Sequence, residues 1–381
     1  MTAPISPLAC LLTLAMMAPM GCTASGAGVT LARADVPRAP ADPAAAKEAG
    51  SAINAFGLDL YQRIANTSGN IVVSPASIAL ALGMARAGAR GITATEMDAV
   101  LRNLATDEHA AWLNALDAAL GTRTGTFKDQ SGKDQPVTLR IANSTFSPAG
   151  MKLEDAFLDA LASRYGAGVR LVDYQANAEA ARKGINTWVS DQTEQRIPEL
   201  LVPGVITPDT RLTLVNAVYL KAAWLTPFVE AQTTDAAFTR LDGSTVSVPF
   251  MSSLGELPYA DGSGWRAVQL PYVGGSLAMT LIVPDAFATF ETSLTPALFA
   301  QVTDALTPRN VALAYPRHGI ESKLELERVL PEIGMPTAFK PGVADFSGIT
   351  LEERLFISAV IHRRTWTSTR RAPRRPPPPR W

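Results

Sequence analysis

Residues 70–97 read NIVVSPASIALALGMARAGARGITATEM and hold the clearest structural pattern in the chain. A short β-branched run, Ile71–Val73, precedes Ser74-Pro75, a capping residue with proline at the first helical position. The stretch that follows, Ile78–Ala87, is apolar on nearly every face. Because a helix without a polar face cannot lie at the surface, this stretch predicts a buried helix.

The two segments before this pattern differ in composition. Residues 47–66 place apolar side chains at three- and four-residue steps, which predicts an amphipathic helix. These side chains are Ile53, Phe56, Leu60 and Ile64. Residues 23–46 are rich in Ala, Pro, Gly and Ser, a composition that favours a tether without regular structure. We therefore expect the folded part to begin near residue 47.

The segments after the pattern mix helices with strands. Val137–Phe146 and Leu212–Leu220 predict strands, whereas Glu154–Tyr165 and Ala178–Gln192 predict helices between them. From Phe238 to Pro284 only strands and turns are expected. A helical part followed by an antiparallel part is typical of the α+β class.

The composition excludes several classes of protein. Hydrophobic residues make up 47% of the chain and charged residues 18%, which suits a globular fold with a substantial core. The formal net charge is −1, but the last 19 residues hold seven Arg and no acidic residue. The rest of the chain is therefore mildly acidic, which argues against nucleic acid as the main partner.

The first residues have the features of an export signal. The run Leu8–Met17 is too short to span a bilayer but has the length of a signal-peptide core. The sequence Met20-Gly21-Cys22 resembles a bacterial lipoprotein box, so Cys22 is a candidate for lipidation. The alternatives to lipidation are simple cleavage and secretion, or a misplaced start codon. Cys10 is the other cysteine, so no disulfide is expected in the body of the fold. We expect the protein to be exported, extracellular or lipid-anchored at the cell envelope.

A family resemblance rests on ordered blocks of sequence. After residues 70–97 these are Ala142-Asn143, Ile185–Val189 (INTWV), Leu214–Trp224 (LVNAVYLKAAW), Pro227-Phe228, Leu270–Pro284 (LPYVGGSLAMTLIVP), Ile333–Phe339 (IGMPTAF), Ala344–Ile349 (ADFSGI) and Ile357–His362 (ISAVIH). In this order they resemble a serpin, a serine protease inhibitor, of a bacterial and exported kind. The expected domains are therefore a signal peptide at 1–22, a tether at 23–46, a serpin-like domain at 47–362 and an aberrant tail at 363–381.

The resemblance implies a fold and a mechanism. It implies a single α+β domain with three β-sheets and about nine helices, lacking the reactive loop and the last core strands. In the family, a serine protease cleaves the reactive loop and is trapped as an acyl-enzyme when the cut loop inserts into the central sheet. The resemblance also implies a monomer without cofactor or metal, and a membrane contact only through a lipid anchor.

Five residues match positions that control sheet opening in the family. Ser74, Ser77, Asn216 and His362 match a polar cluster behind the central strands, where buried polar groups need one another as partners. Trp224 matches the aromatic residue where the loop first enters the sheet. Without the resemblance, Ser74 is simply a helix cap and Trp224 simply fills the core.

The end of the chain departs from the family. After ISAVIH the sequence reads RRTWTSTRRAPRRPPPPRW, which cannot form a reactive-loop hinge or, with its prolines, a strand. One codon choice for this tail, with a single G restored after the codon of Arg363, encodes Ala-Asp-Val-Asp-Val-Asp-Glu-Ala-Gly-Thr-Glu-Ala-Ala-Ala, the family's hinge text. A frameshift is the first hypothesis, and a genuine basic, proline-rich tail is the alternative.

Three functions compete. The first is serine-type endopeptidase inhibition, absent in the chain as written because the reactive loop is missing. The second is a non-inhibitory, serpin-like binding protein. The third, an enzyme, would have only His109, His318 and His362 as bases active near neutral pH, with no nucleophile motif or metal-spaced His pair beside them. We therefore expect no enzyme activity.

Overall fold

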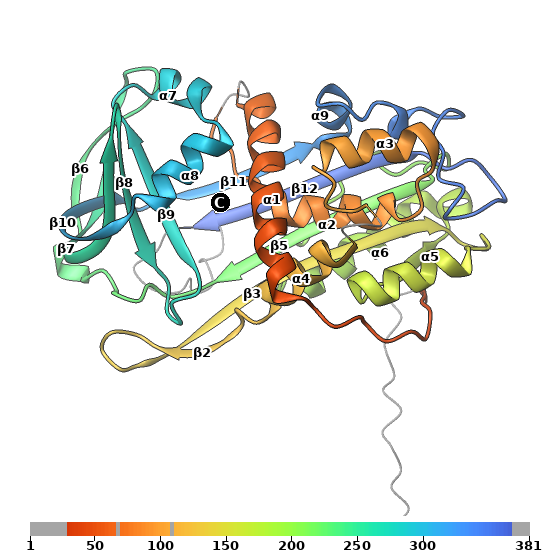
Figure 1. Ribbon diagram of the computed structural model, residues 1–381, viewed down its shortest axis with the longest axis horizontal. Helices are drawn as coiled ribbons and strands as arrows, with labels where there is room; N and C mark the ends of the chain where they lie inside the picture. The colour runs from red at the N-terminus through yellow and green to blue at the C-terminus, as the bar shows by residue number, and fades with distance from the viewer. Residues whose placement is uncertain (1–28, 66–68, 107–109, 368–381) are drawn as a thin grey trace, which may run out of the picture.

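A seven-stranded sheet forms the centre of the computed structural model, which describes residues 29–65, 69–106 and 110–367 (Figure 1). Its middle strands are β3 (Asp134–Pro148), β5 (Leu212–Lys221) and β12 (Ile357–Thr367). β4 (Val169–Val172) and β1 (Val29–Ala32) extend one side, β11 (Gly319–Glu325) closes the other, and β2 (Gly125–Lys128) pairs with the start of β3.

Two apolar layers cover the faces of this sheet. The first eight residues of β5 are all buried, as expected for a strand covered on both faces. On one face lie α1 (Pro43–Ile64), α2 (Pro75–Arg86), α3 (Gly91–Val100) and α4 (Ala110–Gly121). On the other lies α6 (Tyr174–Gln192). The predicted buried helix is α2, which contacts β3 and β5 directly.

A second sheet packs at one end of the molecule (Figure 1). Its strands are β6 (Thr234–Thr239), β7 (Thr245–Gly262), β8 (Trp265–Pro271), β9 (Ala278–Pro284) and β10 (Thr307–Pro316). α7 (Phe287–Ser293) and α8 (Pro296–Asp304) follow β9. Among the helices described here, none combines the length and apolar character that crossing a bilayer requires.

The α+β class and the nine helices of the expected fold are present in the described residues. The remaining helices are α5 (Asp155–Ala160), which continues as the π-helix η1 (Leu161–Tyr165), and α9 (Leu326–Glu332). The described strands join into two hydrogen-bonded sheets instead of three. One reason is that the long strand β7 pairs with β6 over Thr245–Phe250 and with β8 over Tyr259–Gly262, which joins β6 and β8 into the same sheet.

The predicted tether contains regular structure. β1 pairs antiparallel with β4, and α1 begins at Pro43, four residues before the predicted start. Asp42 caps α1, because its Oδ1 accepts a hydrogen bond of 2.9 Å from the backbone N–H of Ala44. The expectation of an unstructured 23–46 segment is therefore wrong for these residues. The edge of β4 supplies the partner that composition alone could not reveal.

Two further expectations are wrong at their boundaries. The run Ile71–Val73 is not a strand, because no strand of the described chain pairs with it. Conversely, β12 continues past His362 to Thr367, with Arg364 opposite Ser322 and Thr367 opposite Gly319 of β11. These first tail residues contain no proline, so their backbone can complete a ladder. Residues 368–381, with the proline run, lie outside the described residues.

Candidate functional site

A polar row crosses the three central strands in register. His362 of β12 stands opposite Asn216 of β5, and Asn216 stands opposite Asn143 of β3. The distance from His362 Nδ1 to Asn216 Oδ1 is 2.7 Å, and Asn216 Nδ2 donates a hydrogen bond to Asn143 Oδ1. His362 is fully buried and Asn216 nearly so. Buried polar groups linked in this way hold neighbouring strands in one register.

The first turn of α2 completes the cluster from the helical side. Ser77 Oγ lies 2.8 Å from Asn216 Oδ1 and 3.0 Å from the carbonyl oxygen of Ser74, so its single proton has two acceptors. The backbone N–H of Ser74 donates to His362 Nε2 at 3.2 Å. The structure thus brings together the four predicted residues Ser74, Ser77, Asn216 and His362. The predicted capping role of the Ser74 side chain is wrong, because that side chain makes no capping hydrogen bond.

These contacts define the tautomer of His362. Nε2 accepts a hydrogen bond from the backbone N–H of Ser74, so it carries no proton itself, and the ring proton lies on Nδ1, which donates a hydrogen bond to Asn216 Oδ1. Both ring nitrogens are therefore engaged in hydrogen bonds within the cluster. Because the ring is also fully buried, it cannot exchange a proton with a substrate in solvent. The cluster is suited to holding the strands together.

The predicted loop-entry aromatic, Trp224, lies three residues beyond the end of β5 at the junction of the two sheets. Its ring stacks on Tyr272, with centroids 4.4 Å apart and planes 13° from parallel. Phe228 meets it edge-on at 6.4 Å. Trp224 also forms an isolated antiparallel bridge with Tyr272. Only 5% of its surface is exposed, so it anchors the end of β5 to the second sheet.

The strands on either side of the cluster are paired in a particular order. β12 and β5 lie side by side and parallel, from Ile357 opposite Leu212 to Arg363 opposite Ala217. The outer neighbours of this pair, β11 and β3, are both antiparallel to it. β5 and β12 therefore form a parallel seam with an antiparallel pairing on each side of it, and β3 with β4 is the other parallel pair of this sheet. Parallel pairing is slightly less stable per residue than antiparallel pairing, so we expect this seam to be weaker than the antiparallel pairings on either side of it.

Comparisons with known proteins agree on one family. Residues 51–367 match the family model Serpin (serine protease inhibitor). The chain belongs to the serpin family. It is 36% identical over 315 residues to an uncharacterized serpin-like protein of Thermococcus kodakarensis, covering 82% of this chain and 71% of that one. It is 32% identical over 324 residues to leukocyte elastase inhibitor of Xenopus tropicalis, covering 82% and 84%.

A solved structure has the same fold as this serpin. Ovalbumin of the emu, Dromaius novaehollandiae, superposes with a TM-score of 0.77 at 26% sequence identity. The match covers 85% of this chain and 87% of ovalbumin. The shared fold therefore extends over most of the chain.

Sequence reasoning missed part of the serpin cluster. Asn143 extends the polar row to β3, and its block was recognised without a role because strand register is not visible in a sequence. Glu327 of α9 was also missed. Its Oε2 accepts a hydrogen bond of 3.4 Å from the backbone N–H of Val360 in β12. Burial raises the pKa of this carboxyl above its ordinary value.

Of the remaining candidate residues, only His318 lies in the described part of the chain, and it is not part of the cluster. Cys10, Cys22 and His109 lie outside the described residues. His318 lies between β10 and β11, with Nδ1 3.0 Å from the carbonyl oxygen of Pro316. Within the described residues, no group of three or more His, Cys, Asp or Glu side chains is placed to hold a metal ion.

Proposed function

We propose that this serpin inhibits serine-type endopeptidases by loop insertion when a reactive loop follows β12, and that the chain as written does not inhibit them. The observation that carries the proposal is the parallel seam between β5 and β12, with the polar row of His362, Asn216 and Asn143 behind it. The relatives named leukocyte elastase inhibitor support the choice of target class.

The direction of the strands explains why a loop could enter at the seam. A segment that leaves the end of β12 and turns back runs antiparallel to β12. Because β5 is parallel to β12, the same segment is antiparallel to β5 as well. Inserted between them, it would replace one parallel ladder with two antiparallel ladders, which increases both the number and the stability of the backbone hydrogen bonds.

Insertion also requires the seam to open. The hydrogen bond between His362 and Asn216 joins the two strands directly, so separation breaks it. Each buried group left without a partner costs about 1–3 kcal/mol, which opposes opening before cleavage. The cluster would thus hold the sheet closed until insertion of the cut loop supplies a larger gain.

The segment that follows His362 in this sequence does not have the composition of an insertable loop. Residues 363–381 contain seven arginines and four consecutive prolines in place of a hinge of small residues. Prolines cannot donate ladder hydrogen bonds, and arginines cannot be buried between strands without partners. We therefore expect this sequence not to insert into the sheet, even where a trypsin-like protease cleaves after one of its arginines.

The test compares two proteins: the chain as written and the version with one G restored after the codon of Arg363. Each is incubated with trypsin-like, chymotrypsin-like and subtilisin-like proteases and then analysed by denaturing electrophoresis. We expect a denaturant-resistant complex with the restored version only. Cleavage of the restored loop should also raise its Tm, because insertion completes the sheet.

Two controls separate trapping from simple cleavage. A protease with an alkylated catalytic serine should form no complex, since the acyl bond needs that nucleophile. A restored version whose hinge threonine is replaced by arginine should be cut without trapping. Failure of the restored version across the whole panel would favour a non-inhibitory binding protein, and a complex with the chain as written would refute the proposal.

Export is a further part of the proposal and rests on the apolar run Leu8–Met17 and on Cys22. Fractionation of the producing cells should place the protein in the envelope or the medium. Labelling with radioactive palmitate should depend on Cys22, so a Cys22→Ser variant should lose both the label and any membrane association. Full-length protein in the cytoplasm would contradict export.

A further inference from the structure

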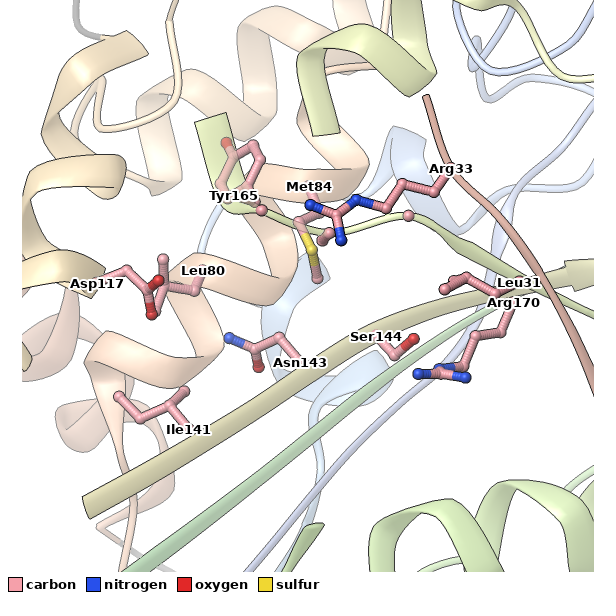
Figure 2. Close-up of a pocket in the computed structure, with 13 residues that line it drawn as sticks. Leu31, Arg33, Leu80, Met84, Asp117, Ile141, Asn143, Ser144, Tyr165 and Arg170 are labelled. Carbon is pink, nitrogen blue, oxygen red and sulfur yellow. The ribbon is translucent and has the colours of Figure 1, made fainter. Parts of the chain in front are cut away.

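The segment that precedes α1 is fastened to the body of the fold, first through β1. This strand pairs with β4 over its whole length, beginning with Val29 opposite Val172. Figure 2 shows Leu31 of β1 beside Arg170 of β4, its partner in the ladder. A Cβ added at Gly184 of α6 would lie 3.0 Å from Val29 Cγ2, so the first residue of β1 also packs closely on that helix.

A second fastening lies beyond β1. Arg38 Nε donates a hydrogen bond of 2.7 Å to Asn114 Oδ1, and Asn114 Nδ2 donates one of 2.9 Å to the carbonyl oxygen of Ala39. The backbone N–H of Ala39 donates to the carbonyl oxygen of Ser163 at 2.8 Å. Asn114 is almost fully buried, so water competes little for its hydrogen bonds. The part of the chain that can act as a free tether therefore ends where β1 begins.

The reach of this tether follows from its length. Val29 follows Cys22, the candidate for lipidation, by seven residues. Because an extended chain spans at most 3.6 Å per residue, the start of β1 can lie no farther than about 25 Å from a bilayer in which Cys22 is anchored. The tether predicted from composition, which ends at Lys47, would have allowed about 90 Å. A lipid anchor at Cys22 therefore holds one particular end of the domain near the bilayer.

Strand register identifies that end. Val29 lies at the level of Pro148, the last residue of β3, because both pair with Val172 of β4. β3 ends beside the start of β5, and β5 starts beside the start of β12. The starts of β1, β5 and β12 thus lie at one end of the central sheet, which we call the base. β12 runs from the base to Thr367, about 33 Å away at 3.3 Å per residue.

The base carries an apolar side chain in solvent. Leu351, in the loop before β12, is 75% exposed. Thr350 Oγ1 donates a hydrogen bond of 2.7 Å to the carbonyl oxygen of Lys152, which places this loop beside the chain that leaves β3. The side chain of Lys152 is exposed as well. An exposed leucine beside an exposed lysine suits the boundary between lipid headgroups and acyl chains.

We propose that the base faces a lipid bilayer when the protein is anchored through Cys22. The short tether holds the base there, with Leu351 and Lys152 on the bilayer side. The opposite end of the central sheet, where β12 ends, points into the aqueous phase.

The orientation has a consequence for inhibition, and this consequence alone rests on the proposed function. In the restored version the reactive loop leaves β12 at the end far from the base. The loop is therefore presented to soluble serine-type endopeptidases in the surrounding solution and not to proteases embedded in the same membrane. The orientation itself requires only attachment at Cys22, so it is measured on the chain as written.

The test attaches the exported form, which begins at Cys22 and keeps every residue that the structure describes, to phosphatidylcholine vesicles. A cyanobenzothiazole lipid condenses with both the amine and the thiol of an N-terminal cysteine, so the attachment point is defined whether or not cells lipidate Cys22. Two variants carry a donor dye on a second cysteine at an exposed position: Asp209→Cys at the base, just before β5, and Lys133→Cys at the far end, just before β3. Energy transfer to acceptors at the vesicle surface reports the height of each dye.

We expect the dye of Asp209→Cys to transfer at least about twice as efficiently as that of Lys133→Cys, because the two ends of β3 lie about 48 Å apart. In the control, about twenty Gly and Ser residues inserted before Val29 lengthen the tether and should remove most of this difference. Equal transfer from the two sites, higher transfer from Lys133→Cys, or a difference that the insertion leaves unchanged would each overturn the proposal. Palmitate labelling of Cys22 in cells tests the anchor separately, so a failure of anchoring and a failure of orientation are distinguishable.

Discussion

Asn216 and His362 stand opposite one another across the parallel seam, and a hydrogen bond of 2.7 Å joins Oδ1 of the first to Nδ1 of the second. The same Asn216 oxygen lies 2.8 Å from Ser77 Oγ of α2. One carbonyl oxygen thus connects both strands of the seam to the helix behind them. Removing it should affect stability more than removing any single donor around it.

The first prediction concerns this difference. Asn216→Ala leaves the His362 N–H, the Ser77 hydroxyl and the Asn143 oxygen without their shared partner, so we expect a loss of about 3 kcal/mol in the free energy of unfolding. In Ser77→Ala the Asn216 oxygen still accepts a hydrogen bond from His362, so we expect a smaller loss of about 1 kcal/mol in the free energy of unfolding. Urea unfolding followed by circular dichroism measures both values. A loss for Ser77→Ala equal to that for Asn216→Ala would contradict the central role of Asn216.

Features of this site that depend on residues close together in the sequence could be predicted, whereas features that depend on residues far apart in the sequence could not. Local patterns predicted α2 and β5 well, because a buried helix and a buried strand have a continuous apolar character visible in the sequence. The family blocks pointed to Asn216 and His362. Asn143 was missed, because its role depends on the register between β3 and β5, and register is a property of two strands far apart in sequence.

The second prediction concerns the structured part of the predicted tether, around Arg38. Arg38 Nε donates to Asn114 Oδ1 at 2.7 Å, although the segment around Arg38 has the composition of a linker. A double-mutant cycle of Arg38→Ala and Asn114→Ala should give a coupling energy of about 1 kcal/mol in urea unfolding, since Asn114 is almost fully buried.

The control for that cycle is an exposed ion pair. Lys128 and Asp134 lie 3.0 Å apart with side chains 70% and 67% exposed. Solvent screens such a pair, so its cycle should give less than about 0.5 kcal/mol. Equal coupling energies in the two cycles would mean that Arg38 does not fasten its segment to α4.

The third prediction is that one substitution has opposite effects at two helical glycines. A Cβ at Gly50 of α1 would meet no atom within 4 Å, whereas a Cβ at Gly83 of α2 would lie 2.5 Å from Leu113 Cδ1. Gly50→Ala should therefore stabilise the protein by about 0.5–1 kcal/mol through helix propensity. Gly83→Ala should destabilise it by about 1–3 kcal/mol, because α2 and α4 must move apart. Thermal unfolding measures both, and a shift of the same sign at the two sites would contradict the packing of α2 against α4.

The last prediction concerns pH and Glu327. Burial raises the pKa of this carboxyl in the folded protein, so the folded state binds the proton more tightly than the unfolded state does. The stabilising contribution is therefore complete below the unfolded pKa, about 4.3, and is lost as the pH rises through the raised folded value. At pH 7.5 the ionised carboxylate costs stability.

Glu327→Gln tests this sign directly. The glutamine oxygen can still accept the hydrogen bond from the N–H of Val360, so the substitution removes the charge and keeps the contact. The variant should be more stable than the parent in urea at pH 7.5, and its advantage should shrink as the pH falls towards 4.5. Glu332→Gln on the same helix is the matched control; that side chain is 49% exposed and paired with Arg63, so its loss should be neutral or slightly destabilising at pH 7.5. A lower stability of Glu327→Gln at pH 7.5 would show that the hydrogen bond to Val360 needs the negative charge, and that this charge stabilises β12 more than burial opposes it.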